Sequence, residues 1–193
     1  LMLTSAIITC TLTTRLKDHA KMSAQAAFRT KILFDTNQLL QRAKSKEEIL
    51  SQTASQLMKL LNRSLIVYPE QDGGLGSEQI FSVDGETAQN IFSAPEERNA
   101  ANWTFANKKR SGAGTDSYPN AKGLYLALRT GGGVFGVIGI DLSEKPLDAF
   151  ENSVLLSILG EGALAIENRR NALEKEQAAL QARNEELRAN LLR

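Results

Sequence analysis

The residues best suited to binding chemistry form one short glycine-rich turn. Gly112 and Gly114 are one residue apart and are followed at once by Thr115 and Asp116. The glycines would leave backbone N–H groups open to close approach, and the two polar side chains supply oxygens. Lys122, six residues further on, adds a positive charge. Because oxygen-rich turns also bind cations, these five residues are a candidate site for a small ligand or a potassium ion.

A simpler interpretation of the same turn stays open. Glycine permits the positive φ angles that tight turns require. Threonine and aspartate side chains often form hydrogen bonds with nearby backbone groups instead of with a ligand. On that interpretation, residues 112–116 shape the chain and bind nothing.

The composition excludes several classes of catalytic and metal site. The 193 residues include one Cys and one His, so a disulfide framework, a Cys-rich zinc site and any two-histidine site are excluded. No nucleophile lies in a pattern that pairs it with a base, so we expect no catalytic residue, no metal and no tightly bound cofactor. The letters at 131–136 match G-x-G-x-x-G, but a dinucleotide site needs a helix after them. The β-branched residues that come next predict a strand, and hence a hairpin.

A seven-residue repeat runs through the last part of the chain. Aliphatic residues sustained at one heptad position indicate a coiled coil. The other expected core position is polar in its middle, at Arg170, Gln177 and Asn184, which weakens the pairing but favours a defined register. We predict that 147–166 packs on the sheet and that 167–193 forms a parallel homodimer; a single charged helix is the alternative. The repeated residues are Leu159, Ile166, Leu173, Leu180 and Leu187.

The middle of the chain alternates between helical and strand patterns. Ser45 and Glu48 form a capping-box pair at the start of a helix. The order of the elements predicts an α+β fold, with a small antiparallel sheet and helices packed on one side. Long helices flank it at both ends. The expected helices are 46–61, one opening at Pro95, and 147–193; the expected strands are 64–69, 78–83, 124–129 and 134–142.

The first 46 residues differ in charge from the rest of the chain. They hold eight basic and two acidic residues, whereas the whole chain has a net charge of +1. Residues 1–14 carry no charge, and cations come after them, which is the order at the cytoplasmic end of a membrane helix. We therefore interpret 1–16 as the end of a truncated transmembrane helix and 17–44 as a juxtamembrane linker helix. A buried helix of a soluble protein is the alternative.

The run at 102–128 resembles the GAF-like domain of the KdpD family, bacterial membrane histidine kinases that respond to potassium limitation and osmotic stress. The resemblance rests on Trp103 and Phe105, the turn at 112–116, Pro119, and the strand at 125–128. Ala127 departs from this pattern, because the family usually has proline there. The resemblance covers roughly residues 1–175.

The resemblance implies a GAF-like sensor domain over 45–166 and a signalling coiled-coil helix over 167–193. The parent protein would phosphorylate itself on histidine and pass the phosphate to a response regulator. This chain carries neither the phosphoacceptor box nor the ATP-binding motifs, so we expect it to have no kinase activity. The implied partners are a second copy, the kinase core of the same chain, through it a response regulator, and the membrane. The implied location is the cytoplasmic side of a bacterial inner membrane, and the small net charge argues against nucleic acid as a partner.

Two classes of function fit these observations. The first is a sensory and signal-relay module that couples membrane or cytosolic signals, such as potassium or osmotic stress, to a downstream kinase core. The alternative is a stand-alone GAF-like adaptor that binds a partner protein through its coiled coil. Transmembrane helices upstream and a phosphoacceptor box downstream would decide for the first.

Overall fold

The computed structural model describes residues 22–24, 26–83 and 85–191. The chain divides into two compact units, Leu1–Asp35 and Thr36–Arg193. In the first unit, the described residues 22–24 and 26–35 are helical. The transmembrane end expected at 1–16 lies outside the described residues. The second unit holds the whole sheet and the helices that pack on it.

Helix α2 (Lys46–Leu61) begins at the cap that its sequence predicts. The Ser45 side chain accepts a hydrogen bond from the Glu48 backbone N–H at 3.1 Å, and the Glu48 carboxylate accepts one from the Lys44 N–H at 2.7 Å. The first bond satisfies a backbone group that the first helical turn leaves free, and the second holds the residue before the cap against the helix. The helix ends at Asn62, which adopts the left-handed conformation. Ile49, Leu50 and the other apolar residues of one face are buried.

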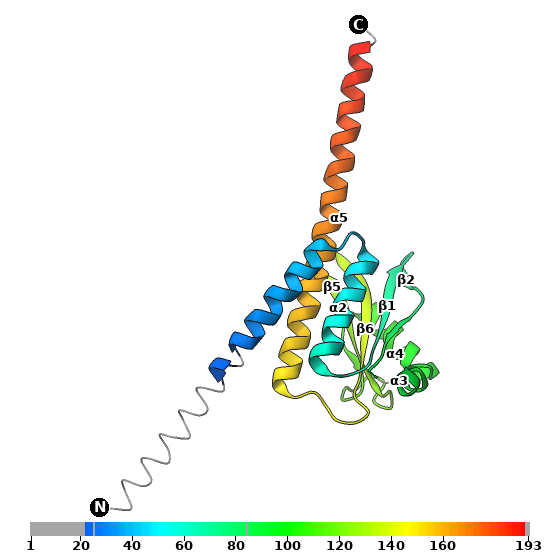
Figure 1. Ribbon diagram of the computed structural model, residues 1–193. Helices are drawn as coiled ribbons and strands as arrows, with labels where there is room; N and C mark the ends of the chain where they lie inside the picture. Colours follow the sequence, from blue (N-terminus) through cyan, green and yellow to red (C-terminus); the bar gives the residue numbers. More distant parts are fainter. Residues whose placement is uncertain (1–21, 25, 84, 192–193) are drawn as a thin grey trace, which may run out of the picture. The chain divides into compact units, whose positions relative to one another are not determined.

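The sheet is antiparallel, with the strand order β2-β1-β6-β5-β4, and β3 also pairs with β1. Its centre is the β5–β6 hairpin, whose turn is formed by the run of glycines (Figure 1). Gly133 has a φ of 146° there, a conformation that favours glycine. The strands are β1 (Leu65–Gln71), β2 (Gly74–Leu75), β3 (Gln79–Phe81), β4 (Ser111–Gly112), β5 (Gly123–Thr130) and β6 (Gly133–Asp141).

Helices cover both faces of the sheet. Helix α2 packs against β1, and α5 (Ala149–Leu191) packs against β5 and α2 on the same face (Figure 1). The opposite face carries α4 (Pro95–Asn107), with α3 (Gly85–Phe92) beside it. Strand residues that point to this second face, including Ile66, Tyr68, Tyr125 and Val137, form one buried cluster with α3 and α4. The predicted α+β architecture is confirmed, and the helices lie on two sides of the sheet where one was expected.

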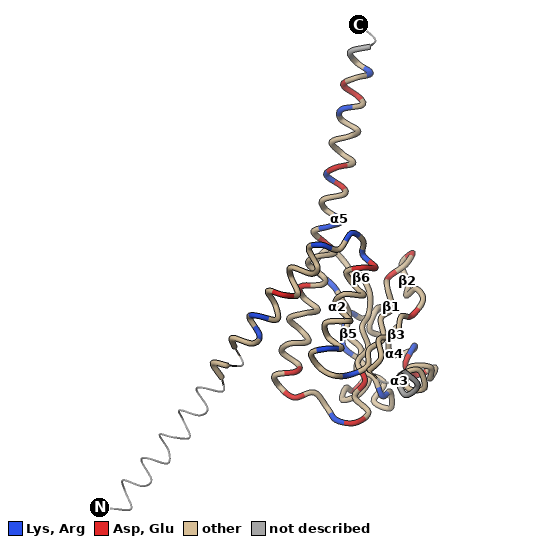
Figure 2. The backbone as a smooth tube through the Cα atoms, viewed as in Figure 1, with Lys and Arg blue, Asp and Glu red and all other residues tan. Residues whose placement is uncertain are grey.

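Helix α5 is 43 residues long and changes character along its length. Asp148 and Glu151 cap its start by accepting hydrogen bonds from each other's backbone N–H groups, at 2.7 and 2.9 Å. Residues from Val154 to Ile166 include its buried positions, whereas every side chain from 168 to 189 is exposed. Charges of both signs are distributed along that exposed part (Figure 2).

Among the described residues, α5 is the helix that is long and apolar enough to cross a membrane. In its most apolar stretch 39% of the residues are buried, and Leu155 and Ile158 of this helix lie in the core of the domain. This burial is the ordinary behaviour of the central helix of a globular domain.

Candidate functional site

A buried carboxylate, Glu97, organises the face of the sheet that α4 covers. Its side chain is 2% exposed and accepts hydrogen bonds from the backbone N–H groups of Lys122 at 2.7 Å and Gly123 at 3.1 Å. The Tyr125 hydroxyl donates a third, at 2.7 Å. Glu97 lies in the first turn of α4, where a negative charge also suits the helix dipole. The carboxylate therefore fixes α4 to the start of β5.

The two tyrosines of this face are strongly perturbed. Burial raises the pKa of Tyr125, and its hydrogen bond to the Glu97 carboxylate raises that pKa further. Burial also raises the pKa of Tyr68 to about 12. The Arg98 guanidinium lies 5.0 Å from the centre of the Tyr68 ring and reaches Glu78 at 2.9 Å. These tyrosines fill the face with neutral side chains and stay protonated at neutral pH.

The structure gives the glycine-rich turn a mainly structural role at two of its positions. Gly112 has a φ of 94° and belongs to β4, where a side chain would collide with the Gly123 carbonyl. The Thr115 hydroxyl lies 2.8 Å from the carbonyl oxygens of Gly112 and Ser117, so the turn itself uses it. Two of the groups expected to meet a ligand are therefore already engaged.

The structure brings part of the predicted site together and leaves Lys122 outside it. Gly114, Thr115 and Asp116 line an open hollow together with Trp103 and Arg110. The Lys122 side chain is exposed and is not part of that lining, and the Lys122 backbone serves Glu97 instead. The described residues contain no group of three His, Cys, Asp or Glu side chains that could hold a metal ion. A ligand role for these five residues stays a prediction.

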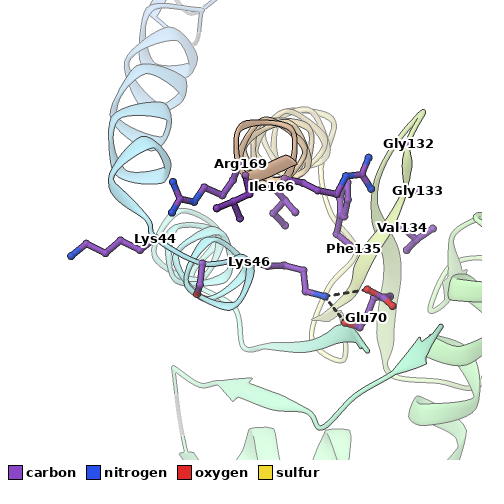
Figure 3. A pocket seen from close by; sticks show the side chains of 12 residues that line it. Lys44, Lys46, Glu70, Gly132, Gly133, Val134, Phe135, Ile166 and Arg169 are labelled. Carbon is purple, nitrogen blue, oxygen red and sulfur yellow. Dashed lines mark hydrogen bonds and ion pairs between the residues drawn. The ribbon is translucent and has the colours of Figure 1, made fainter. Parts of the chain in front are cut away.

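A second hollow, not foreseen from the sequence, lies where α5 leaves the domain. This exit pocket is a cavity of about 460 Å³ (Figure 3). Phe135 and Ile166 supply apolar wall, and Lys46 crosses one side of it to reach Glu70. No sequence pattern could reveal the pocket, because its lining comes from four separate segments. Its full lining is Lys44, Ser45, Lys46, Glu70, Gly132, Gly133, Val134, Phe135, Ile166, Arg169, Arg170 and Leu173.

The tip of the β5–β6 hairpin contacts α5 beside the exit pocket. The Thr130 hydroxyl donates a hydrogen bond to the Glu167 carboxylate at 2.9 Å. The Arg170 guanidinium lies 5.7 Å from the centre of the Phe135 ring. A side chain at Gly132 would come within 2.8 Å of the Arg170 guanidinium, so the glycine permits this close approach. The sheet is thus in direct contact with the last buried turn of the outgoing helix.

The residues of the heptad repeat fall into two groups. Leu159 and Ile166 are buried in the core of their own domain, at 5% and 4% exposure. Leu173, Leu180 and Leu187 are exposed by 42%, 55% and 54%. The residues of the heptad repeat that are available to a second copy therefore start at Leu173, and two other apolar residues of α5, Leu156 and Leu164, are also exposed. Homodimerisation through them stays a prediction.

Comparison with known proteins relates the chain to part of one longer protein. No protein-family model matches the sequence. Sensor protein KdpD of Clostridium acetobutylicum is 30% identical over 194 aligned residues, which cover 100% of this chain. The chain spans 22% of the length of that relative. The similarity therefore concerns one segment of a much longer protein.

Solved structures share the fold of this segment. The GAF domain of the potassium sensor histidine kinase KdpD from Escherichia coli has a TM-score of 0.56 at 21% identity, covering 78% of this chain and 99% of that one. The GAF domain of a proposed sensor histidine kinase from Pseudomonas syringae pv. tomato also has a TM-score of 0.56, at 18% identity, covering 83% and 98%. At such identities the likeness establishes the fold. The chain has the GAF fold and is related along its whole length to one segment of the sensor protein KdpD.

Proposed function

We propose that this chain is the sensory and signal-relay segment of a bacterial two-component histidine kinase. The observation that carries the proposal is the continuity of α5. One unbroken helix contributes Leu155 and Ile158 to the core of the GAF domain and then extends as far as Leu191, with every side chain from 168 to 189 exposed. A rigid helix that is shared between a sensor core and an outgoing segment can transmit a change in packing to a domain attached at its far end.

The whole-length similarity to KdpD supports a kinase core as the receiver of that change. In this proposal the segment itself catalyses nothing. It acts as a homodimer through Leu173, Leu180 and Leu187, and it passes potassium or osmotic signals to the kinase core and so to a response regulator. The many cations of residues 1–46 suit an anionic inner leaflet, which supports a position beside the cytoplasmic face of the inner membrane.

A chimeric kinase tests the relay. The aligned segment of the Clostridium acetobutylicum KdpD is replaced by this chain, and the full-length protein is reconstituted in lipid vesicles. We expect the chimera to phosphorylate itself from ATP and to change its rate with potassium concentration. Ala172→Pro should destabilise the helical conformation in the exposed part of α5 by about 3 kcal/mol. We expect this variant to lose the response to potassium.

The matched control is Ala172→Gln, which keeps a good helix former at the same exposed position. It should respond to potassium as the unsubstituted chimera does. A chimera whose phosphorylation and potassium response are the same with Ala172→Pro as with Ala172→Gln would contradict a relay through α5.

A further inference from the structure

The exit pocket has the size and lining of a small-molecule site. Its volume of about 460 Å³ falls within the range of roughly 300–1,000 Å³ that is usual for ligand pockets. Such pockets combine an apolar wall with a few polar groups that fix orientation. Val134, Phe135 and Leu173 provide the apolar part here, and charged side chains stand around it (Figure 3).

The charge of the exit pocket selects for anions. Four basic residues and one acidic residue, Glu70, line it. Lys46 is already paired with Glu70 at 3.1 Å, so these two charges offset each other. The excess positive charge therefore belongs to Lys44, Arg169 and Arg170. Within residues 26–83 and 85–191, the structure shows no ion pair for the Lys44 or Arg169 side chain.

The two arginines occupy different sides of the exit pocket. Arg169 extends from α5 toward the segment that carries Lys44 (Figure 3). Arg170 lies over the Phe135 ring, and its nearest carboxylate, that of Glu174, is 3.7 Å away in an exposed pair of small energetic value. A planar guanidinium can bind a carboxylate, sulfonate or phosphate with two hydrogen bonds.

We propose that the exit pocket binds an amphipathic anion, a molecule with a compact apolar body and one carboxylate, sulfonate or phosphate group. The apolar body lies against Val134 and Phe135, and the acidic group binds one of the two arginines, Arg169 or Arg170, while the other adds positive charge to the same pocket. Ligand binding is independent of the relay proposed above; only its effect on the outgoing coil rests on that function. The same chemistry could come from a soluble aromatic acid or from a lipid with a phosphate headgroup.

Titration of the 193-residue chain with two probes tests binding and separates these sources. Naphthalene-1-sulfonate represents the soluble aromatic anions, and decyl phosphate represents the lipids. Backbone amide NMR shifts should move and saturate at Gly132, Gly133 and Leu173. Saturation by the first probe alone points to a metabolite, and saturation by the second alone points to a lipid; either supports the pocket.

Substitutions then show whether the arginines hold the anion. Arg169→Gln together with Arg170→Gln should raise the Kd at least about tenfold, because the charge-assisted contact and the second positive charge of the pocket are both lost. The matched control is Arg183→Gln with Arg188→Gln, the same change of charge on the exposed part of α5, and it should leave the Kd within about twofold. Both double variants substitute exposed residues, so both should fold.

Three results would overturn the proposal. The first is the absence of saturable shifts with either probe, and the second is equal Kd values for the two double variants. The third is the appearance of shifts only after the protein is diluted to monomer, which would mean that a second copy covers the pocket. Binding without any effect on the phosphorylation of the chimera would leave the pocket in place and show that its ligand does not act on the outgoing helix.

Discussion

The hydroxyl of Thr130 and the carboxylate of Glu167, 2.9 Å from oxygen to oxygen, join the tip of the β5–β6 hairpin to α5. Glu167 directly follows Ile166, the last buried residue of the helix. The hydrogen bond therefore sits at the boundary between the part of α5 that belongs to the core and the part that leaves it.

Thr130→Val should weaken the contact between the hairpin tip and α5 without changing the shape of the side chain. We expect a loss of about 0.5–1.5 kcal/mol in the free energy of unfolding, the usual value of one hydrogen bond. Amide hydrogen exchange should speed up between residues 163 and 170. The control is Glu174→Gln, which removes an exposed pair with Arg170 and should change stability by less than about 0.5 kcal/mol. Equal exchange in the two variants would show that the hairpin contact does not hold α5.

Tyr125→Phe should destabilise the domain by about 1–3 kcal/mol. The substitution removes one of the three hydrogen bonds of the buried Glu97 carboxylate and leaves that charge less well satisfied. Urea unfolding followed by circular dichroism measures the change. Tyr118→Phe is the comparison, because Tyr118 is 38% exposed and should tolerate the loss of its hydroxyl. Similar midpoints for both variants would argue against Glu97 as an anchor of α4.

The domain should lose stability in alkali. Burial raises the pKa of Tyr68 to about 12, above the value near 10 of an unfolded chain, and the pKa of Tyr125 is also raised. The folded protein therefore keeps these protons when the unfolded chain loses them. The stabilisation is complete below about pH 10 and is lost as the pH rises through about 12, at up to about 1.4 kcal/mol per pH unit for each tyrosine.

Urea midpoints between pH 9 and pH 12 check this pH dependence. Tyr68→Phe should have a shallower decline than the wild-type chain over that range, because one of the two groups no longer titrates. Parallel declines would mean that Tyr68 is not responsible. The two proteins share every other ionisable group, so the comparison isolates the contribution of Tyr68.

Gly112→Ala and Gly114→Ala should differ in their cost. Both glycines have positive φ angles, 94° and 73°, so alanine is strained at either position by about 1 kcal/mol. A Cβ at Gly114 meets nothing within 4 Å, whereas one at Gly112 collides with the Gly123 carbonyl. We expect Gly112→Ala to lower the thermal midpoint clearly more than Gly114→Ala does. Equal thermal midpoints for the two variants would mean that the close approach of Gly112 to the Gly123 carbonyl is not required for the pairing of β4 with β5.

Leu180→Asn should weaken association of the exposed part of α5. A polar residue replaces an apolar one at a position that is 55% exposed in the single chain and lies on the predicted coiled-coil surface. Sedimentation velocity at tens of micromolar should show a shift from dimer toward monomer. Ala182→Asn, two positions along and on the side of the helix that faces away from that surface, should sediment as the wild type does. A monomeric wild-type chain would dismiss the coiled coil altogether.

Local signals in the sequence predicted much of the fold. The capping pair of Ser45 and Glu48 located the start of α2, and the β-branched residues after Gly133 correctly favoured a hairpin over a dinucleotide site. The long final helix was also foreseen. Each of these depends on residues that are close together in the chain, which is where propensity and periodicity carry information.

The features that the sequence did not reveal depend on distant contacts. Helix α3 was missed because Asp84-Gly85 reads as a turn signal, and β4 is only two residues long and is defined by its pairing with β5. Glu97 looked like an ordinary acid of a first helical turn, since its partners lie 25 or more residues away. Its helical spacing to Ala100, Ala101 and Thr104, all buried, was the one available clue.

The exposed part of α5 is long enough that a small rotation at its base moves its far end by several ångströms. From residue 167 to Leu191 the helix extends roughly 37 Å at 1.5 Å per residue, and it is held by the domain at one end only. A tilt of about 5° at the Thr130–Glu167 contact would therefore displace its far end by about 3 Å. Helical interfaces switch between packing states through shifts of about one to two ångströms. A tilt too small to disturb the core of the sheet is therefore enough to switch such an interface at the far end of the helix.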